Sequence, residues 1–301
     1  MTSGTSRSLG DFGGWPGVLG RLADGRDLAT GEAAAALREV LEGNASPAQI
    51  AAFVFGLRCK GETVEEMTGL VRAMLAVAEP VKVGADVETR MIDTCGTGGD
   101  RSGTINVSTI AALVVAGAGV PVCKHGGRAA SSRAGSADVL EALGVVIDLG
   151  PEGVRACIEA ANIGFCFAPR YHPAMRHAIP IRRDLGVPTA FNFLGPLANP
   201  ARVSRQVVGV GDPAMAAKMA GVLAGNGSAH VLVVHGADGL DELSTTGPST
   251  MIEWRAGSSH SHVVDPAELG LAPARLDQLL GGDAATNAEL ARRVLDAERG
   301  P

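Results

Sequence analysis

At 301 residues, the chain is long enough for one large domain or two smaller ones, each with a real hydrophobic core. Hydrophobic residues (46%) and charged residues (19%) stand in the balance of an ordinary globular protein. The net charge of −6 and the aromatic content of 3% argue against a nucleic-acid binder that relies on a broad basic face or on base stacking.

Neither the cysteines nor the apolar runs point to secretion or to a membrane. The five cysteines show no C-x-x-C spacing, which favours buried thiols in a reducing compartment. Residues 1–14 are rich in Gly and Ser, lack the apolar stretch of a signal peptide and are expected to be flexible. The longest apolar run, Ile110–Val122, is too short and too interrupted by glycine to span a bilayer. We therefore expect a soluble cytoplasmic protein.

The chain from Trp15 to Val83 has a helical pattern throughout. Helix starts are predicted at Thr30, at Ser46 (as N-cap, with Pro47 at the first helical position) and at Thr63. A second helical stretch, rich in arginine and histidine, lies at 171–197. We expect it to pack on the N-terminal helices, which gives a small helical domain built from residues 15–83 and 171–197.

The rest of the chain, residues 84–170 and 198–301, alternates short β-rich runs with helices. The expected strands are 89–93, 121–124, 145–148, 164–167, 205–210 and 230–235. This alternation predicts a large α/β domain with a mostly parallel central sheet covered by helices. Ligands of such a sheet gather at the carboxyl ends of its strands, where the glycine-rich loops of this chain fall.

The first of these loops is Asp93-Thr-Cys-Gly-Thr-Gly-Gly-Asp100, which follows the apolar Met91 and Ile92. It precedes Thr104-Ile-Asn-Val-Ser-Thr109, the start of a long small-residue helix pattern. Glycines let backbone N–H groups close on phosphate oxygens, and a helix N-terminus adds partial positive charge. The order of strand, glycine turn and helix therefore predicts an anion cradle.

The second loop runs from Lys124 to Asp138 and carries a lysine, arginines, several hydroxyls and backbone donors directly after a predicted strand. Such groups bind polyphosphates through charge-assisted hydrogen bonds. An isolated loop of this composition would equally fit a solvated loop with a capping serine. Because two anion-competent loops follow successive predicted strands, phosphate binding is the favoured interpretation.

Carboxylates form the third group, in Asp238-Gly-Leu-Asp-Glu242 after the apolar strand Val231–Val234. One or two carboxylates, completed by waters and substrate phosphates, suit Mg²⁺. A simple acidic turn is the alternative. Because two predicted phosphate loops accompany them, Asp241 and Glu242 are favoured as ligands of Mg²⁺.

The fourth group lies in Pro169–Arg183. Arg182 is suited to hold a carboxylate bidentately, beside a wall of apolar side chains. A solvated helix face is the alternative for the arginines of this stretch, Arg176, Arg182 and Arg183, and is expected for at least one of them. His172 fits a capping or packing role as well as a ligand contact.

Together these segments closely resemble the anthranilate phosphoribosyltransferase family of tryptophan biosynthesis, over nearly the whole chain. Besides the four groups above, the matching segments are Ser46-Pro-Ala-Gln49, Lys60-Gly-Glu-Thr63, His172-Pro-Ala-Met175, Phe191–Pro200 and His235–Gly247. The resemblance implies a nucleoside phosphorylase/phosphoribosyltransferase-like fold, usually as a homodimer. It also implies Mg²⁺-dependent transfer of the phosphoribosyl group from 5-phosphoribosyl-1-pyrophosphate (PRPP) to anthranilate, with release of pyrophosphate.

The resemblance also implies binding roles for individual residues at the matching positions. For PRPP they are Gly96, Thr97, Gly98, Gly99, Asp100, Thr104, Asn106, Ser108, Thr109, Lys124 and Ser136. For anthranilate they are Gly96, His125, Gly127, His172 and Arg182. For the metal they are Ser108, Asp241 and Glu242. An aryl amine is already neutral at pH 7, so no residue is expected to act as an essential general base.

Two features depart from the family pattern. The family's Lys-His-Gly-Asn-Arg reads Lys124-His-Gly-Gly-Arg128, so a carboxamide near the aromatic substrate is absent and the pocket is expected to be wider. The sequence also stops at Arg299-Gly-Pro301, where the family usually continues into a further helical stretch. If 301 residues are the whole molecule, we expect exposed apolar sheet surface and weaker stability or dimerisation.

Other functions on a similar scaffold remain open from the sequence. Gly127 leaves room for a paralogous phosphoribosyltransferase with another aryl amine acceptor. Nucleoside phosphorylases share the architecture, but their lysine-serine-threonine loop is missing, as is the acidic fingerprint of the purine-salvage phosphoribosyltransferases. A non-catalytic binding protein, including nucleic-acid-binding relatives, would be expected to lack the metal-binding carboxylates and to have a basic surface. Here Asp241 and Glu242 are present and the net charge is negative.

Overall fold

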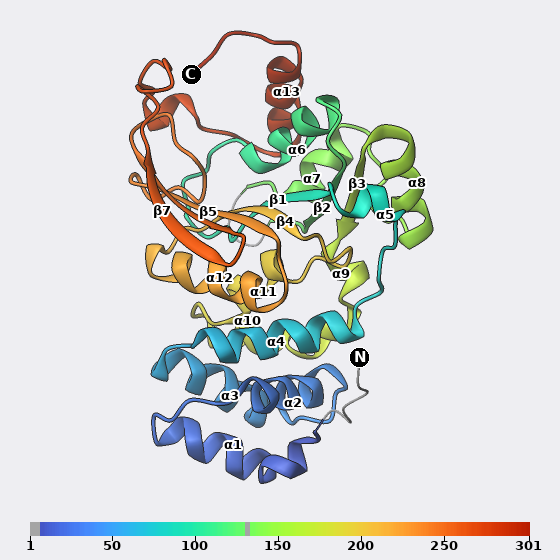
Figure 1. Cartoon of the computed structure of the whole chain (residues 1–301), viewed down its shortest axis with the longest axis vertical. Helices are drawn as coiled ribbons and strands as arrows, with labels where there is room; N and C mark the ends of the chain where they lie inside the picture. Colours follow the sequence, from blue (N-terminus) through green and yellow to red (C-terminus); the bar gives the residue numbers. More distant parts are fainter. Residues whose placement is uncertain (1–6, 130–132) are drawn as a thin grey trace. The chain divides into compact units, whose positions relative to one another are not determined.

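The computed structural model describes residues 7–129 and 133–301, and the chain divides into two compact units (Figure 1). The first unit is the chain up to Ala78 together with His172–Ala198, and the second is Glu79–Tyr171 together with Asn199–Pro301. The units divide after residues 78, 171 and 198, where the sequence predicts divisions after 83, 170 and 197. Residues 1–6 of the expected flexible N-terminus and residues 130–132 of the second loop lie outside the described residues.

Helices make up the first unit, as the sequence pattern predicts. They are η1 (Leu9–Phe12), α1 (Gly14–Ala23), α2 (Thr30–Leu41), α3 (Pro47–Lys60), α4 (Val64–Val77), η2 (Pro173–His177), α10 (Ile179–Leu185) and α11 (Phe191–Leu197). The predicted N-cap of α3 is confirmed, because the Ser46 hydroxyl accepts the Gln49 N–H at 3.3 Å and the Gln49 side chain accepts the Ser46 N–H at 2.8 Å. The two sequence-separated parts pack together, α10 against α3 and α11 against α4.

A buried carboxylate ties the start of α4 to the chain that precedes α2. Glu66 is fully buried and accepts the backbone N–H groups of Leu28 and Thr63, each at 2.8 Å. Lys60 donates to the same carboxylate at 3.0 Å, so the buried charge is both paired and hydrogen-bonded.

One correction concerns the N-terminus. Residues 9–12, expected to be flexible, form the 3-10 helix η1 (Leu9–Phe12). Leu9 is buried, and Asp11 accepts the Ser8 backbone N–H at 2.7 Å. The buried Leu9, the half-buried Phe12 and a local cap hold this segment, and so short a stretch gives no periodic signal.

A seven-stranded sheet forms the centre of the second unit, in the order β3-β2-β1-β4-β5-β6-β7. The strands are β1 (Ile92–Gly96), β2 (Val122–Gly126), β3 (Ile163–Phe167), β4 (Arg205–Gly209), β5 (His230–Gly236), β6 (Ser249–Arg255) and β7 (Ser258–Val264). Strands β1 to β5 run parallel, and β6 and β7 add an antiparallel hairpin. The predicted fold class, helical unit plus mostly parallel α/β unit, is confirmed.

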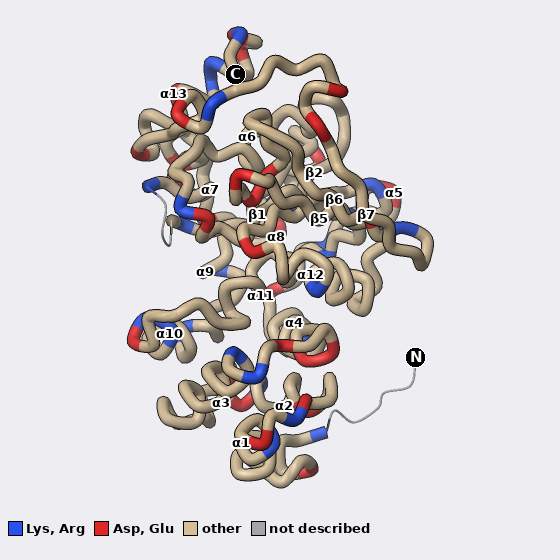
Figure 2. Tube along the Cα trace, turned by 90° about the vertical axis from the view of Figure 1, so that its left-hand side faces the viewer, with Lys and Arg blue, Asp and Glu red and all other residues tan. Residues whose placement is uncertain are grey.

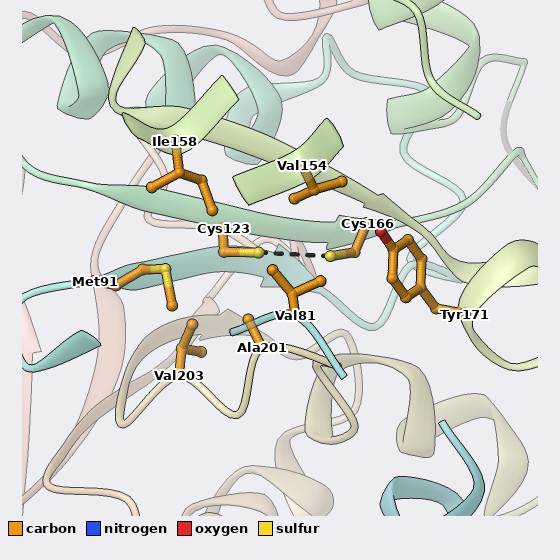
Figure 3. Close-up of a cluster of buried hydrophobic side chains, with 9 residues drawn as sticks. All are labelled: Val81, Met91, Cys123, Val154, Ile158, Cys166, Tyr171, Ala201 and Val203. Carbon is orange, nitrogen blue, oxygen red and sulfur yellow. Dashed lines mark hydrogen bonds between the residues drawn. The ribbon is translucent and has the colours of Figure 1, made fainter. Parts of the chain in front are cut away.

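Helices pack on both faces of the parallel strands. The helices of this unit are α5 (Ala85–Glu88), α6 (Val107–Gly117), α7 (Ser136–Ala142), α8 (Pro151–Ala161), α9 (Ala168–Tyr171), α12 (Pro213–Gly225), η3 (Leu276–Gln278) and α13 (Ala284–Leu295). Val154 and Ile158 of α8 pack over Cys123 and Cys166, whose Sγ atoms lie 3.5 Å apart in a buried cluster (Figure 3). On the opposite face of β2, Val122 packs against α6.

One prediction about the sheet is wrong, and one part of the sheet was not predicted. Residues 145–148 form no strand: Val145 and Val146 are 40% and 67% exposed, and only Ile147 enters the core. The hairpin of β6 and β7 was not predicted, because β7 is a run of serine and histidine followed by two valines and is exposed at almost every position. Backbone pairing with β6, rather than apolar burial, defines this edge strand.

Charges of both signs are interspersed along the backbone traces of both units (Figure 2). None of the helices in the described part of the chain combines the length and the apolar character that a membrane span requires.

Candidate functional site

The strand order reverses direction between β1 and β4, and the carboxyl ends of these two strands carry glycine-rich turns. In doubly wound sheets this switch point is where ligands bind. The turn after β1 contains Gly98 and Gly99 with φ of 63° and 82°, a conformation that L side chains rarely adopt. The predicted anion cradle therefore lies at the position where the topology favours a ligand.

Asp241 packs directly against this turn. The Gly98 N–H donates to Asp241 Oδ2 at 2.7 Å, and a Cβ on Gly96 would overlap the same oxygen. A Cβ on Gly209 would overlap the Asp241 carbonyl oxygen. The glycines that end β1 and β4 are thus required for the carboxylate turn to approach the sheet, a role that their sequence context alone did not reveal.

Glu242, in the turn after β5, contacts the start of α6 and lies near the buried Lys124. The Ser108 N–H donates to Glu242 Oε1 at 3.2 Å. The ammonium of Lys124, which is only 2% exposed, donates to the Thr94 carbonyl and, at 3.4 Å, to the Ser108 hydroxyl. Ser108 therefore connects the predicted metal pair to the predicted phosphate-binding lysine.

The two carboxylates are held at an electrostatic cost. Burial raises the pKa of Glu242 to about 8, and the neighbouring charge of Asp241 adds to the shift; the charge of Lys124 and the Ser108 N–H oppose it. Burial and the charge of Asp100 raise the pKa of Asp241 to about 6, against the opposing hydrogen bond from Gly98. A bound cation would reduce the free-energy cost of ionising both carboxylates.

This donor set fits Mg²⁺. Among residues 7–129 and 133–301, no group of three or more His, Cys, Asp or Glu side chains forms a ready metal cage. Mg²⁺ does not need one, since it commonly takes one or two carboxylates and keeps waters and substrate phosphates as its other ligands. Asp241, Glu242 and the Ser108 hydroxyl supply that kind of set, all oxygen atoms.

The middle of the first loop is held by its own side chains. The Thr97 hydroxyl accepts the Gly211 N–H at 3.2 Å, which joins the turns after β1 and β4. Asp100 accepts the Ser102 hydroxyl at 2.7 Å, and that hydroxyl also lies 3.1 Å from the hydroxyl of Thr104. The loop is therefore shaped before any ligand arrives.

The second loop meets the first at the start of α6. The Thr109 hydroxyl donates to the Ser136 hydroxyl at 3.0 Å, and the Asn106 amide donates to the Ala134 carbonyl at 3.0 Å. Gly127 accepts the Ala137 N–H at 3.1 Å. Through these bonds, Asn106 and Thr109 at the start of α6 contact the second loop at Ala134 and Ser136.

Arg128, the basic residue at the end of the Lys124–Arg128 run, bonds Asp138 at 2.7 Å and Glu141 at 2.9 Å. Asp138 also accepts the backbone N–H groups of Ala129 at 3.1 Å and Gly135 at 2.9 Å. One carboxylate thus closes the base of the second loop and offsets the charge of Arg128.

Asp93 is a buried carboxylate next to the predicted site residues His125 and Lys124, and no role of its own was predicted for it from the sequence. It is fully buried in β1 and accepts the His125 N–H at 3.2 Å and the Asn199 amide at 2.8 Å. Burial raises its pKa, which the charge of Lys124 and these hydrogen bonds oppose. An aspartate directly after apolar residues in a buried strand was the available signal.

His172 and Arg182 belong to the helical unit. The Nε2 atom of the buried His172 lies 2.9 Å from the Ala198 carbonyl, and burial lowers the pKa of this imidazole. Arg182 lies over the Phe191 ring at 5.8 Å, and burial lowers its pKa. Arg176 and Arg183 are exposed, as expected for a solvated helix face.

Known proteins resemble this chain along most of its length. Residues 16–78 match the helical bundle domain, and residues 88–301 the a/b domain, of a glycosyl transferase family. The anthranilate phosphoribosyltransferase of Saccharopolyspora erythraea is 53% identical over 96% of this chain and 81% of its own length, and that of Salinispora arenicola is 53% identical over 95% and 81%.

Solved structures give the same result. The anthranilate phosphoribosyltransferase (TrpD) of Thermus thermophilus matches with a TM-score of 0.87 at 43% identity, over 94% of this chain and 84% of that one. The Saccharomyces cerevisiae enzyme in complex with PRPP and Mg matches with a TM-score of 0.82 at 28% identity, over 93% and 80%.

Proposed function

The chain belongs to the anthranilate phosphoribosyltransferase family, and we propose that it transfers the 5-phosphoribosyl group of PRPP to anthranilate, releasing pyrophosphate, in tryptophan biosynthesis. One observation of the structure supports this proposal above the others. Asp241 lies against the glycine turn after β1, and Glu242 lies beside Ser108 and Lys124 at the start of α6. This combination of a carboxylate pair, a backbone anion cradle and a buried ammonium suits a magnesium pyrophosphate.

Different groups of residues are assigned to the phosphates of PRPP and to its magnesium ion. We assign its phosphate groups to the backbone of the Gly96–Asp100 turn, to the start of α6 and to Lys124, with further hydroxyl contacts from Thr104, Thr109 and Ser136. Asp241, Glu242 and Ser108 would hold Mg²⁺, which when bound supplies positive charge to the pyrophosphate. Since the negative charge of the pyrophosphate grows as its bond to the ribosyl carbon breaks, fixed donors of this kind stabilise the transition state more than the ground state.

The acceptor is assigned to His125, Gly127, His172 and Arg182, with the Arg182 guanidinium on the anthranilate carboxylate. A neutral imidazole at His172 fits an aromatic substrate, because the lowered pKa leaves this ring uncharged at pH 7. The amine of anthranilate carries its own lone pair at that pH, so positioning, rather than proton removal, is the contribution of these residues. A homodimer is the proposed assembly.

The test follows anthranilate fluorescence in purified protein with PRPP and Mg²⁺, beside a chelated control. Magnesium-dependent loss of the signal is expected. Folded protein that binds PRPP yet leaves the fluorescence unchanged would overturn anthranilate as the acceptor. In that case substituted aryl amines are the next substrates to assay, because Gly127 removes a side chain from this region.

A further inference from the structure

A segment of the C-terminal part of the chain lies along the first anion loop. Residues 279–287, here called the strap, pair with residues 103–106. The Ile105 N–H donates to the Leu279 carbonyl at 3.0 Å, and the Gly281 N–H donates to the Gly103 carbonyl at 2.8 Å. Thr104 and Leu280 form an antiparallel bridge between these bonds. The loop between β1 and α6 is thus held along its second half by backbone from far along the sequence.

Asn287 connects the strap to the loop through its side chain. It is 3% exposed, and its Oδ1 accepts the Gly282 N–H at 2.6 Å while its Nδ2 donates to Asn106 Oδ1 at 2.8 Å. The Asn106 amide in turn donates to the Ala134 carbonyl of the second loop. Each carboxamide uses one donor and one acceptor, so turning either one over would set like groups against each other.

The backbone is adapted to this contact. A Cβ on Gly281 would lie 3.0 Å from the Thr104 carbonyl oxygen and would collide with the Asn287 carboxamide. Only glycine at this position lets the strap approach the loop so closely. Asp283 caps α13 by accepting the Thr286 N–H at 2.9 Å, which fixes the first turn of the helix that carries Asn287.

We propose that Asn287 is a positioning residue for PRPP: it orients Asn106, and with it the start of α6, before the substrate binds. This inference rests on the proposed function, which assigns Asn106 to PRPP. Each amide of the pair keeps one N–H hydrogen and one oxygen lone pair beyond these bonds, so Asn106 remains able to bind substrate while it is held. A side chain ordered in advance loses less conformational entropy on binding.

The decisive variant is Asn287→Asp, which keeps the acceptor for Gly282 but sets an oxygen against the oxygen of Asn106. We expect PRPP affinity, measured by calorimetry with Mg²⁺ present, to fall on the order of tenfold, the equivalent of one lost buried bond and its unpaired group. The turnover number at saturating PRPP should change little. Asn287→Ala, which sets no oxygen against Asn106, serves as the second variant and should lower affinity less.

A double-mutant cycle separates positioning from general destabilisation. In an Asn106→Ala background, Asn287→Asp should lower PRPP affinity no further, because the group through which it acts is gone. Asn226→Asp is the matched control: the Asn226 carboxamide donates to the Val222 carbonyl at the C-terminal end of α12, and PRPP affinity should stay at the wild-type value. Wild-type affinity in Asn287→Asp, or an undiminished loss in the Asn106→Ala background, would overturn the inference.

The same titrations separate this inference from the proposed function. Wild-type protein that binds PRPP but does not consume anthranilate would defeat the function and leave the role of Asn287 standing if Asn287→Asp still weakens PRPP. Normal turnover with an unaffected Asn287→Asp variant would defeat the inference alone. Wild-type protein that does not bind PRPP would overturn both.

Discussion

Two groups of side chains beside the first anion loop are stabilised in opposite ways. In the first, here called the strained end, Asp241 lies against the turn after β1 and Glu242 lies beside Ser108. Both carboxylates are buried with raised pKa values, so ionising them costs free energy that a bound cation would offset. In the second, here called the neutral end, Asn106 bonds Asn287 and Thr109 bonds Ser136, all without charge. The comparison shows that one end is strained until its ligand binds, whereas the hydrogen bonds of the other are formed beforehand.

The largest effect should come from removing charge at the strained end. Glu242→Gln is expected to lower turnover on the order of 10²- to 10³-fold, the usual loss when one electrostatic stabiliser of a transition state is removed. The same variant should raise the melting temperature of the metal-free protein near pH 8, because a carboxylate with a raised pKa destabilises the fold where it ionises. Steady-state kinetics and thermal melts measure the two effects.

These two results must occur together. If Glu242→Gln kept wild-type turnover, the metal assignment would be wrong. If it lost turnover and its melting temperature also fell, the Glu242 carboxylate would stabilise the metal-free fold instead of destabilising it. The proposed difference between the two ends would then be wrong.

The pH dependence of Mg²⁺ binding is the next largest effect. Below pH 8 the buried Glu242 is mostly protonated, so Mg²⁺ must displace a proton, and its dissociation constant should fall by up to about tenfold per pH unit between pH 6.5 and 8. Since the folded pKa lies above the ordinary value of 4.5, metal-free stability should fall as pH rises toward 8. Calorimetric titration at several pH values measures the slope, and Glu242→Gln, without the titrating group, should flatten it.

Adding a side chain at a glycine of the strained end should displace the turn that carries Asp241. In Gly209→Ala the new methyl group overlaps the Asp241 carbonyl, so the carboxylate turn must shift. We expect a loss of about 1–3 kcal/mol in the free energy of unfolding, as for other overpacked sites, together with weaker Mg²⁺ binding. Gly117→Ala, at the end of α6 with no atom within 4 Å of the added Cβ, is the control and should be neutral or stabilising. Equal stability in both variants would show that the close approach imposes no constraint.

The sequence predicts the strained end better than the neutral one, for a physical reason. Adjacent carboxylates after an apolar strand, and glycines after another, are local signals of charge and of backbone freedom. Asn287 gives no such signal: it is one polar residue in a helix, and its role exists only because the strap lies along residues 103–106. Asp93 gives a weak local signal, an aspartate after apolar residues, but its partners Asn199 and His125 come from other parts of the chain.

The fold shows the same limit. Caps such as Ser46, and the strands β1 to β5, follow from local patterns and were predicted, whereas the strand expected at 145–148 is absent. The hairpin of β6 and β7 depends on pairing between strands that bury little apolar surface, so periodicity carries almost no information about it.

The smallest effect should come from the neutral end. Thr109→Val keeps the shape of the side chain but removes the hydroxyl that donates to Ser136 at 3.0 Å. Because Thr109 is buried and the bond is between neutral groups, we expect a loss of about 1 kcal/mol in the free energy of unfolding, with PRPP affinity reduced only slightly. Thr89→Val, where the hydroxyl bonds the Asp86 carbonyl at the surface, is the matched control and should change stability by less than about 0.5 kcal/mol. Denaturant titration resolves this difference. If Thr109→Val lost as much turnover as Glu242→Gln, the neutral end would also stabilise the transition state. The proposed difference between the two ends would then be wrong.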